Sequence, residues 1–165
     1  MFRHIVAAVD DHQGNVQALR QAGRLAAAVD ARLTLCHVVD LQALANRTVG
    51  TSDNHQLHEA GRQAAQALLE AAEKVALNEG CHRIHLHAGE TWEGKGALAH
   101  AFVQFAERER ADLVVLGTHG RTGLRHLLMG SFAEAVLREA PCPVMVIRGD
   151  QEEADSAVAD RPPLL

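Results

Sequence analysis

The sequence predicts an α/β fold, namely a single doubly wound open sheet of five parallel strands with helices on both faces. Short apolar runs alternate along the chain with longer segments of helical periodicity, which is the pattern of strands joined by helical crossovers. The runs are almost continuously apolar, as in strands that are covered on both faces of a sheet. The length of 165 residues fits one domain.

Five apolar runs predict the strands. Each run is short and is bounded by polar residues, glycine or proline, which is typical of strands. The third run is the least apolar because it contains three histidines, and we expect it to be the weakest strand. The predicted strands are residues 5–9, 33–39, 82–88, 113–116 and 143–147.

Four segments of helical periodicity predict the helices. The longest is expected to begin at a capping pair, Asp53 and Gln56, and to end at Gly80. Residues 41–52, which precede it, are expected to form a polar connection. The other helices are predicted over residues 16–29, around residues 98–105 and over residues 131–140. We expect the buried face of the longest helix to carry Leu57, Ala60, Ala64, Leu68, Ala71 and Val75.

Charge and hydropathy limit the possible partners. Residues 149–165 form an acidic tail of net charge −4, which we expect to be disordered, and the whole chain carries −5. The domain over residues 1–148 is therefore nearly neutral, which disfavours nucleic acid as a partner because nucleic-acid binding needs a basic surface. No apolar run reaches the ~18 residues of a membrane span. An apolar segment begins by residue 5 and leaves no room for a signal peptide, so we expect a cytoplasmic protein without a membrane partner.

Two loops that follow predicted strands form the candidate ligand site. In an open parallel sheet, ligands bind beyond the carboxyl ends of the strands, where the strand order reverses. One loop starts at Asp10, and the other carries glycines at positions 117, 120, 123 and 130 before a helix that Ser131 opens. Glycines let a ligand approach the backbone, and a helix N-terminus attracts anions. With added positive charge from Arg121, Arg125 and the neighbouring histidines, this loop predicts a phosphate cradle.

The same residues also allow a purely structural interpretation. Ser131 and Glu134 have the spacing of a capping box, which would satisfy the amide groups of the helix end without any ligand. Glycines also mark ordinary turns. From the glycine content alone, phosphate binding and a structural turn are about equally supported.

The spacing Gly117-x2-Gly120-x9-Gly130-Ser131 resembles the nucleotide-binding signature of the universal stress protein family. Residues 113–124 and 130–138 around it are also similar to that family, as are residues 5–10, 35–40 and 141–147, so the resemblance covers residues 2–148. It implies the strand order 3-2-1-4-5, which places the first and fourth strands side by side. It also implies that ATP binds between Asp10 and Gly117, at the switch point.

The resemblance further implies roles for individual residues. Leu116 and Gly117 would lie against the ribose, and Val38 would contact adenine through its backbone. Asp10 would hold Mg²⁺ through phosphate oxygens. Ala8, Val9 and Asp10 would line the base and ribose, whereas His119, Gly120, Arg121, Gly130, Ser131 and Phe132 would surround the phosphates.

The chain also departs from the pattern of this family at three places. Residues 11–15 differ from the Gly-Ser start that is usual for this loop. Phe132 stands where the family usually has a small aliphatic residue, so its ring would narrow the phosphate end. Residues 89–96 are longer and more polar than usual, as expected of a lid or a surface feature.

Other functions lack their motifs in this sequence. A phospho-receiver domain would use Asp10 and Asp11, but it also needs an Asp at the end of the third strand and a Lys at the end of the fifth. Fast phosphoryl transfer is disfavoured because the P-loop lysine is missing. No Cys or carboxylate completes a zinc set with the eleven histidines, which we interpret as surface or helix-covered side chains.

We therefore expect an ATP-binding universal stress protein that acts as a nucleotide-dependent regulatory or sensor module in stress response, with an unidentified protein partner. We predict no catalytic residue. The alternatives are a slow ATPase or autophosphorylating enzyme, and a nucleotide-free dimeric interaction protein whose pocket is blocked by Phe132. The last strand, Val144 to Ile147, would leave an open apolar edge, which we expect to pair with its own copy in a homodimer, as the family resemblance implies.

Overall fold

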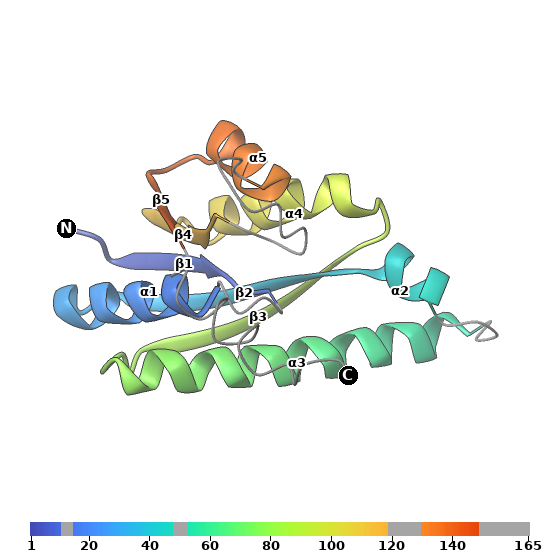
Figure 1. Cartoon of the computed structure of the whole chain (residues 1–165), viewed down its shortest axis with the longest axis horizontal. Coiled ribbons are helices and arrows are strands. Elements are labelled where there is room, and N and C mark those ends of the chain that lie inside the picture. The colour runs from blue at the N-terminus through green and yellow to red at the C-terminus, as the bar shows by residue number, and fades with distance from the viewer. Residues whose placement is uncertain (11–14, 48–52, 119–129, 149–165) are drawn as a thin grey trace, which may run out of the picture.

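A parallel sheet lies between two helical layers (Figure 1). The structure, a computed structural model, describes residues 1–10, 15–47, 53–118 and 130–148, and the predicted tail lies outside these ranges. The strand order β3-β2-β1-β4-β5 confirms the predicted fold class and topology. The strands are β1 (His4–Ala8), β2 (Arg32–Asp40), β3 (Ile84–Thr91), β4 (Leu113–Gly117) and β5 (Val144–Ile147).

The helices cover both faces of the sheet. α1 and α3 pack against each other on one face, and α4 and α5 pack against each other on the other (Figure 1). A short helix, α2, directly follows β2, so the prediction of a polar connection over residues 41–52 was wrong for its first seven residues. Leu41 at the start of α2 is fully buried, and tertiary packing therefore stabilises a helix too short to form alone. The described helices are α1 (Asn15–Val29), α2 (Leu41–Arg47), α3 (Asn54–Asn78), α4 (Lys95–Arg108) and α5 (Ser131–Glu139).

The long helix α3 begins and ends as predicted. The side chain of Asp53 caps its N-terminus by accepting a hydrogen bond from the backbone nitrogen of His55 at 2.9 Å. Gly80, just past its C-terminus, has φ +85°, a left-handed conformation that favours glycine.

The buried face of α3 differs from the predicted one. After Leu57 it lies one residue further along, and Gly61 is the reason that this face approaches β2 so closely. A Cβ at Gly61 would lie 3.2 Å from Cγ1 of Val39, so no larger side chain fits without displacement. The buried residues are Leu57, Gly61, Ala65, Leu69, Ala72 and Ala76.

Each face of the sheet has its own hydrophobic cluster, and alternate residues of a strand belong to opposite clusters. Ile5 and Ala7 of β1 face the cluster beneath α1 and α3. Val6, with Ala8 at its margin, faces the cluster beneath α4 and α5. This alternation places the strand backbones in the middle layer with only their ends open to ligands.

The two strands β2 and β3 extend beyond the end of β1. The last residue of β1, Ala8, pairs with Cys36, whereas residues 37–40 of β2 pair with residues 88–91 of β3. This extension, which we call the β2–β3 arm, reaches toward α2 (Figure 1). A third, small cluster of Val39, Leu41, Leu57 and Ala65 forms its core.

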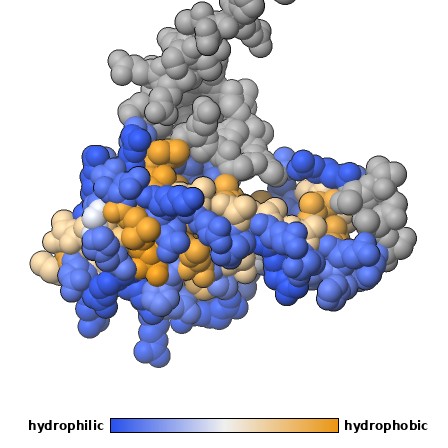
Figure 2. Space-filling view, turned by 90° about the horizontal axis from the view of Figure 1, so that it is seen from below, coloured by the Kyte–Doolittle hydropathy of each residue, from blue (hydrophilic) through white to orange (hydrophobic). Residues whose placement is uncertain are grey.

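The surface is mostly polar on the side of α3. In Figure 2, which looks onto this side, hydrophilic residues dominate and apolar residues form separate groups between them. Within the described ranges, none of the helices has both the length and the apolar character needed to cross a bilayer.

Candidate functional site

The carboxyl ends of β1 and β4 lie side by side, because the two strands pair in parallel. Their pairing brings Asp10, two residues beyond β1, to the same sheet edge as Gly117, the last residue of β4. Ala8, Asp10 and Gly117 are half-buried at this edge, whereas Val9 and Leu116 are buried beneath it. The strand order reverses between β1 and β4, so this edge is where a doubly wound sheet binds its ligand.

The N-terminus of α5 is joined to the end of β4. The backbone nitrogen of Gly130 donates a hydrogen bond to the carbonyl oxygen of Thr118 at 3.0 Å, and Thr118 itself donates to Ile147 of β5 at 2.9 Å. Thr118 and Gly130, which flank the glycine-rich segment, therefore lie next to each other. This contact brings Gly130 and Ser131 to the edge that carries Asp10 and Gly117.

Among the residues that the structure describes, no side chain caps the N-terminus of α5. The N-cap residue is Gly130, one residue before Ser131. The capping box of Ser131 and Glu134 is therefore not formed, and the structural interpretation loses its main support. Gly130 has φ −63°, which any residue adopts, so its backbone conformation does not require glycine.

Phe132 is anchored in the protein core. Its ring centroid lies 5.7 Å from that of Phe102 in α4, with the ring planes tilted by 58°. Phe132 is half-buried and packs against the cluster between α4, α5 and the sheet. At least part of the ring is thus held away from the open sheet edge.

Val38 lies beside a small pocket between β2, β3 and α4. The pocket has a volume of about 150 Å³ and is lined by Cys36, His87, Phe105 and Arg108, among others. His87 stacks on Phe105 with a centroid distance of 3.7 Å. Burial lowers the pKa of His87, and burial raises the pKa of the Cys36 thiol to about 12. Typical ligand pockets have volumes of at least ~300 Å³. This pocket is smaller, so by itself it is too small for a nucleotide.

Three predicted phosphate contacts, His119, Gly120 and Arg121, lie outside the described residues, as does Arg125. The remaining predicted residues come from four parts of the chain that meet near one edge of the sheet. Val38 belongs to β2, next to β1, and the others lie at the ends of β1 and β4 and at the start of α5.

Two side chains that sequence analysis did not single out hold the segment after β1. Asn15, the first residue of α1, donates from Nδ2 to the carbonyl oxygen of Ala8 at 3.2 Å. His37 places Nδ1 2.7 Å from the carbonyl oxygen of Val9. Two features of the sequence could have indicated these residues. Asn15 lies at a helix start, where asparagine is common, and His37 is a histidine inside an apolar strand.

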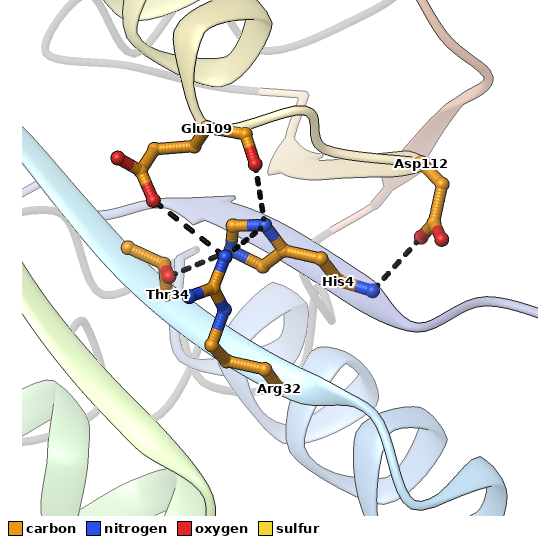
Figure 3. A network of polar contacts seen from close by, with 5 residues as sticks. All are labelled: His4, Arg32, Thr34, Glu109 and Asp112. Atoms are coloured by element: carbon orange, nitrogen blue, oxygen red, sulfur yellow. Dashed lines mark hydrogen bonds and ion pairs between the residues drawn. The ribbon is translucent and has the colours of Figure 1, made fainter.

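A second polar cluster lies at the opposite, amino-terminal edge of the sheet (Figure 3). His4 is only 6% exposed, and its Nε2 lies 2.9 Å from Oγ1 of Thr34. Its backbone nitrogen donates to the carboxylate of Asp112 at 3.1 Å, and Arg32 and Glu109 lie against its ring. Through these contacts the cluster joins β1, β2 and the end of α4.

The segment over residues 89–96 lies partly in β3 and partly at the surface. β3 continues to Thr91, and Trp92 beyond it is 45% exposed. The rings of Trp92 and His58 of α3 meet edge-on, with their centroids 5.9 Å apart. Nδ1 of His58 lies 2.7 Å from Oε2 of Glu90. The segment is therefore a surface feature that fastens β3 to α3. Among the described residues, no three His, Cys, Asp or Glu side chains are grouped so that they could hold a metal ion.

The strand order defines a doubly wound α/β protein with its switch point between β1 and β4. The chain belongs to the universal stress protein family, since residues 1–148 match that family. A universal stress protein of Methanocaldococcus jannaschii is 31% identical over 156 residues, which cover 93% of this chain and 86% of the relative.

Solved structures agree with the fold. A universal stress protein in complex with cAMP superposes with a TM-score of 0.66 at 22% identity, covering 90% of this chain and 98% of its own. The universal stress protein of Archaeoglobus fulgidus in complex with dAMP gives 0.61 at 22% identity, covering 88% and 98%. The family resemblance seen in the sequence is confirmed by the match of residues 1–148 and by the relative from Methanocaldococcus jannaschii.

Proposed function

We propose that this protein binds ATP, together with Mg²⁺, where β1, β4 and α5 meet, and that it acts as a nucleotide-dependent regulatory module in the cytoplasm. The observation that carries the proposal is the hydrogen bond from Gly130 to Thr118, which brings the uncapped N-terminus of α5 to the end of β4. The free amide groups of a helix N-terminus are well suited to phosphate. The two solved relatives in complex with cAMP and dAMP support an adenine nucleotide as the ligand.

Residue roles follow from this arrangement. Asp10 would contact the ribose and hold Mg²⁺ through phosphate oxygens, since its carboxylate is a ligand type that Mg²⁺ prefers. The backbone of Val38, which lies on the strand next to β1, would receive adenine. Ser131 is exposed at the first turn of α5 and would contact the phosphates. Because lysine occurs only at positions 74 and 95, the site favours binding over phosphoryl transfer.

Calorimetric titration of the nucleotide-stripped protein tests this function. We expect ATP with Mg²⁺ to bind at about one per chain with a micromolar Kd, or about −8 kcal/mol. Gly130→Val should abolish binding and leave the fold intact, and Asp10→Ala should weaken binding and its Mg²⁺ dependence. Gly96→Ala is the matched control, because a Cβ there meets no atom within 4 Å. Absence of binding in the folded wild-type protein would refute the proposal, and sustained turnover would instead indicate a slow ATPase.

We also propose that the protein forms a homodimer through β5. This strand is an edge of the sheet, and its four residues, Val144–Ile147, are all half-buried although all are apolar. Unpaired apolar edges are normally covered, and a second copy of the same strand can cover this one across a two-fold axis. An unidentified partner protein would bind this dimer and would distinguish its nucleotide-bound state from its empty state.

A further inference from the structure

Two side chains fix the backbone between the end of β1 and Asp10. The amide of Asn15 holds the carbonyl oxygen of Ala8 at 3.2 Å, and the ring of His37 holds the carbonyl oxygen of Val9 at 2.7 Å. Asn15 belongs to α1 and His37 belongs to β2. The backbone nitrogen of Val9 completes the arrangement by donating to the carbonyl of Cys36 at 2.8 Å.

The chemistry of these contacts defines how they act. A carbonyl oxygen only accepts hydrogen bonds, so His37 donates from Nδ1 in the contact with Val9. Asn15 is 3% exposed, and losing the partner of a group this buried is unfavourable. Both contacts therefore resist rotation of the peptide groups that they hold.

The contact with His37 bears directly on Asp10. The carbonyl group of Val9 and the nitrogen and Cα of Asp10 belong to one planar peptide unit. Fixing that carbonyl fixes the plane, and with it the position of Cα of Asp10, from which the side chain leaves the backbone. His37 also directly precedes Val38 in β2, so one residue ties the position of Asp10 to that of Val38.

We infer that Asn15 and His37 are positioning residues of the nucleotide site, which set the separation and orientation of Asp10 and Val38 before any ligand binds. This inference rests on the proposed ATP binding. The competing explanation is that both contacts only stabilise the fold. Thr34, at the other end of β2, provides the comparison, because it is equally buried and its hydroxyl contacts His4 far from the candidate site.

The test compares four variants: His37→Leu, Asn15→Leu, His37→Asn and Thr34→Val. His37→Leu and Asn15→Leu remove the donors. His37→Asn keeps an N–H donor close to the place of Nδ1, and Thr34→Val removes a buried hydrogen bond elsewhere. Two quantities are measured in the full-length protein. The first is amide hydrogen exchange of residues 5–10 without nucleotide, and the second is the Kd for ATP with Mg²⁺.

We expect His37→Leu and Asn15→Leu to raise the exchange rates of Val9 and Asp10 about tenfold and to weaken ATP binding about tenfold. His37→Asn should restore both quantities to within about threefold of the wild type. Thr34→Val should lower the unfolding temperature and leave both quantities unchanged. A purely structural role would change exchange and stability in the donor-deleted variants but leave the Kd for ATP unchanged.

Two results would overturn the inference. The first is unchanged exchange at Val9 and Asp10 in both donor-deleted variants, and the second is faster exchange with an unchanged Kd for ATP. Failure of the wild-type protein to bind ATP is a separate outcome that refutes the proposed function. The exchange measurement in nucleotide-free protein then still decides whether these side chains hold the segment.

Discussion

Nδ1 of His4 and a guanidinium nitrogen of Arg32 lie 2.8 Å apart, while the carbonyl oxygen of Glu109 lies 3.0 Å from the same ring nitrogen. A donor and an acceptor thus compete for one atom. When Nδ1 carries no proton it accepts from Arg32, and Nε2 then donates to Thr34 (Figure 3). A protonated ring would direct a proton on Nδ1 toward the guanidinium group, so this cluster favours the neutral ring.

Acid should therefore weaken the fold through His4. Burial lowers its pKa from 6.5, and the charge of Arg32 lowers it further, against opposing effects of Glu109 and Asp112. Because the pKa is lower in the folded than in the unfolded chain, the stabilisation is fully present above pH 6.5 and is lost as the pH falls from 6.5 through the lower pKa of the folded protein. The free energy of unfolding in urea should fall less between pH 7.5 and pH 5.5 in His4→Gln than in the wild type. Equal losses in both proteins would contradict this prediction.

Crowding between α1 and α3 should make Gly23 intolerant of a side chain. A Cβ at Gly23 would lie 3.1 Å from the backbone Cα of Ala76, whereas a Cβ at Gly96 meets nothing within 4 Å. Both changes to alanine gain helix propensity, so Gly96→Ala should stabilise the protein by roughly 0.5–1 kcal/mol. Gly23→Ala should destabilise it by about 1 kcal/mol, because overpacking outweighs that gain. If the denaturant midpoints of both variants moved in the same direction, α1 and α3 could move apart to accommodate the added methyl group, and the prediction would be wrong.

Phe132 should contribute more to stability than to nucleotide binding. Its ring packs on Phe102, and Phe132→Val should lower the free energy of unfolding by about 1–2 kcal/mol, less than for a fully buried phenylalanine. The Kd for ATP should not rise, because the smaller side chain leaves more space at the phosphate end. Calorimetric titration of the folded variant with ATP measures this Kd. A clearly higher Kd would instead indicate that the ring contacts the nucleotide.

The β5 dimer should depend on the outward-facing backbone of Val146. Pro143 and Ile147 direct their carbonyl oxygens toward β4, where they accept from Val114 and Thr118. Alternate residues of a parallel strand face opposite sides, so the N–H group of Val146 points away from β4. Light scattering should report a dimer for the wild type and a monomer for Val146→Pro, with the circular dichroism of the fold retained. A monomeric wild-type protein would refute the dimer.

Sequence patterns predicted β1 and β4 well because these strands are covered on both faces and therefore carry uninterrupted apolar runs. The α3 helix shows where such patterns fail. Its alanines supply two neighbouring apolar stripes, and tertiary contacts such as that of Gly61 with Val39 select one of them. The short helix α2 was missed for a related reason, since burial of Leu41 is a tertiary effect.

The candidate site was predictable only in part. Glycine spacing and Asp10 predicted residues that the fold brings to one sheet edge, because strand ends and helix starts leave local signals. The bond between Gly130 and Thr118 and the contacts of Asn15 and His37 with backbone carbonyls leave no such signal. They depend on residues that are distant along the chain and meet only in the folded protein.

The β2–β3 arm gives the molecule a region that can unfold by itself. Its two strands pair with each other past the end of β1, and its core is a small cluster separate from the two main ones. Such a unit opens at a lower free energy than the whole sheet. His37 lies at the base of this arm, so each opening would release its hold on Val9. A nucleotide held between Asp10 and Val38 would therefore slow the opening of this arm.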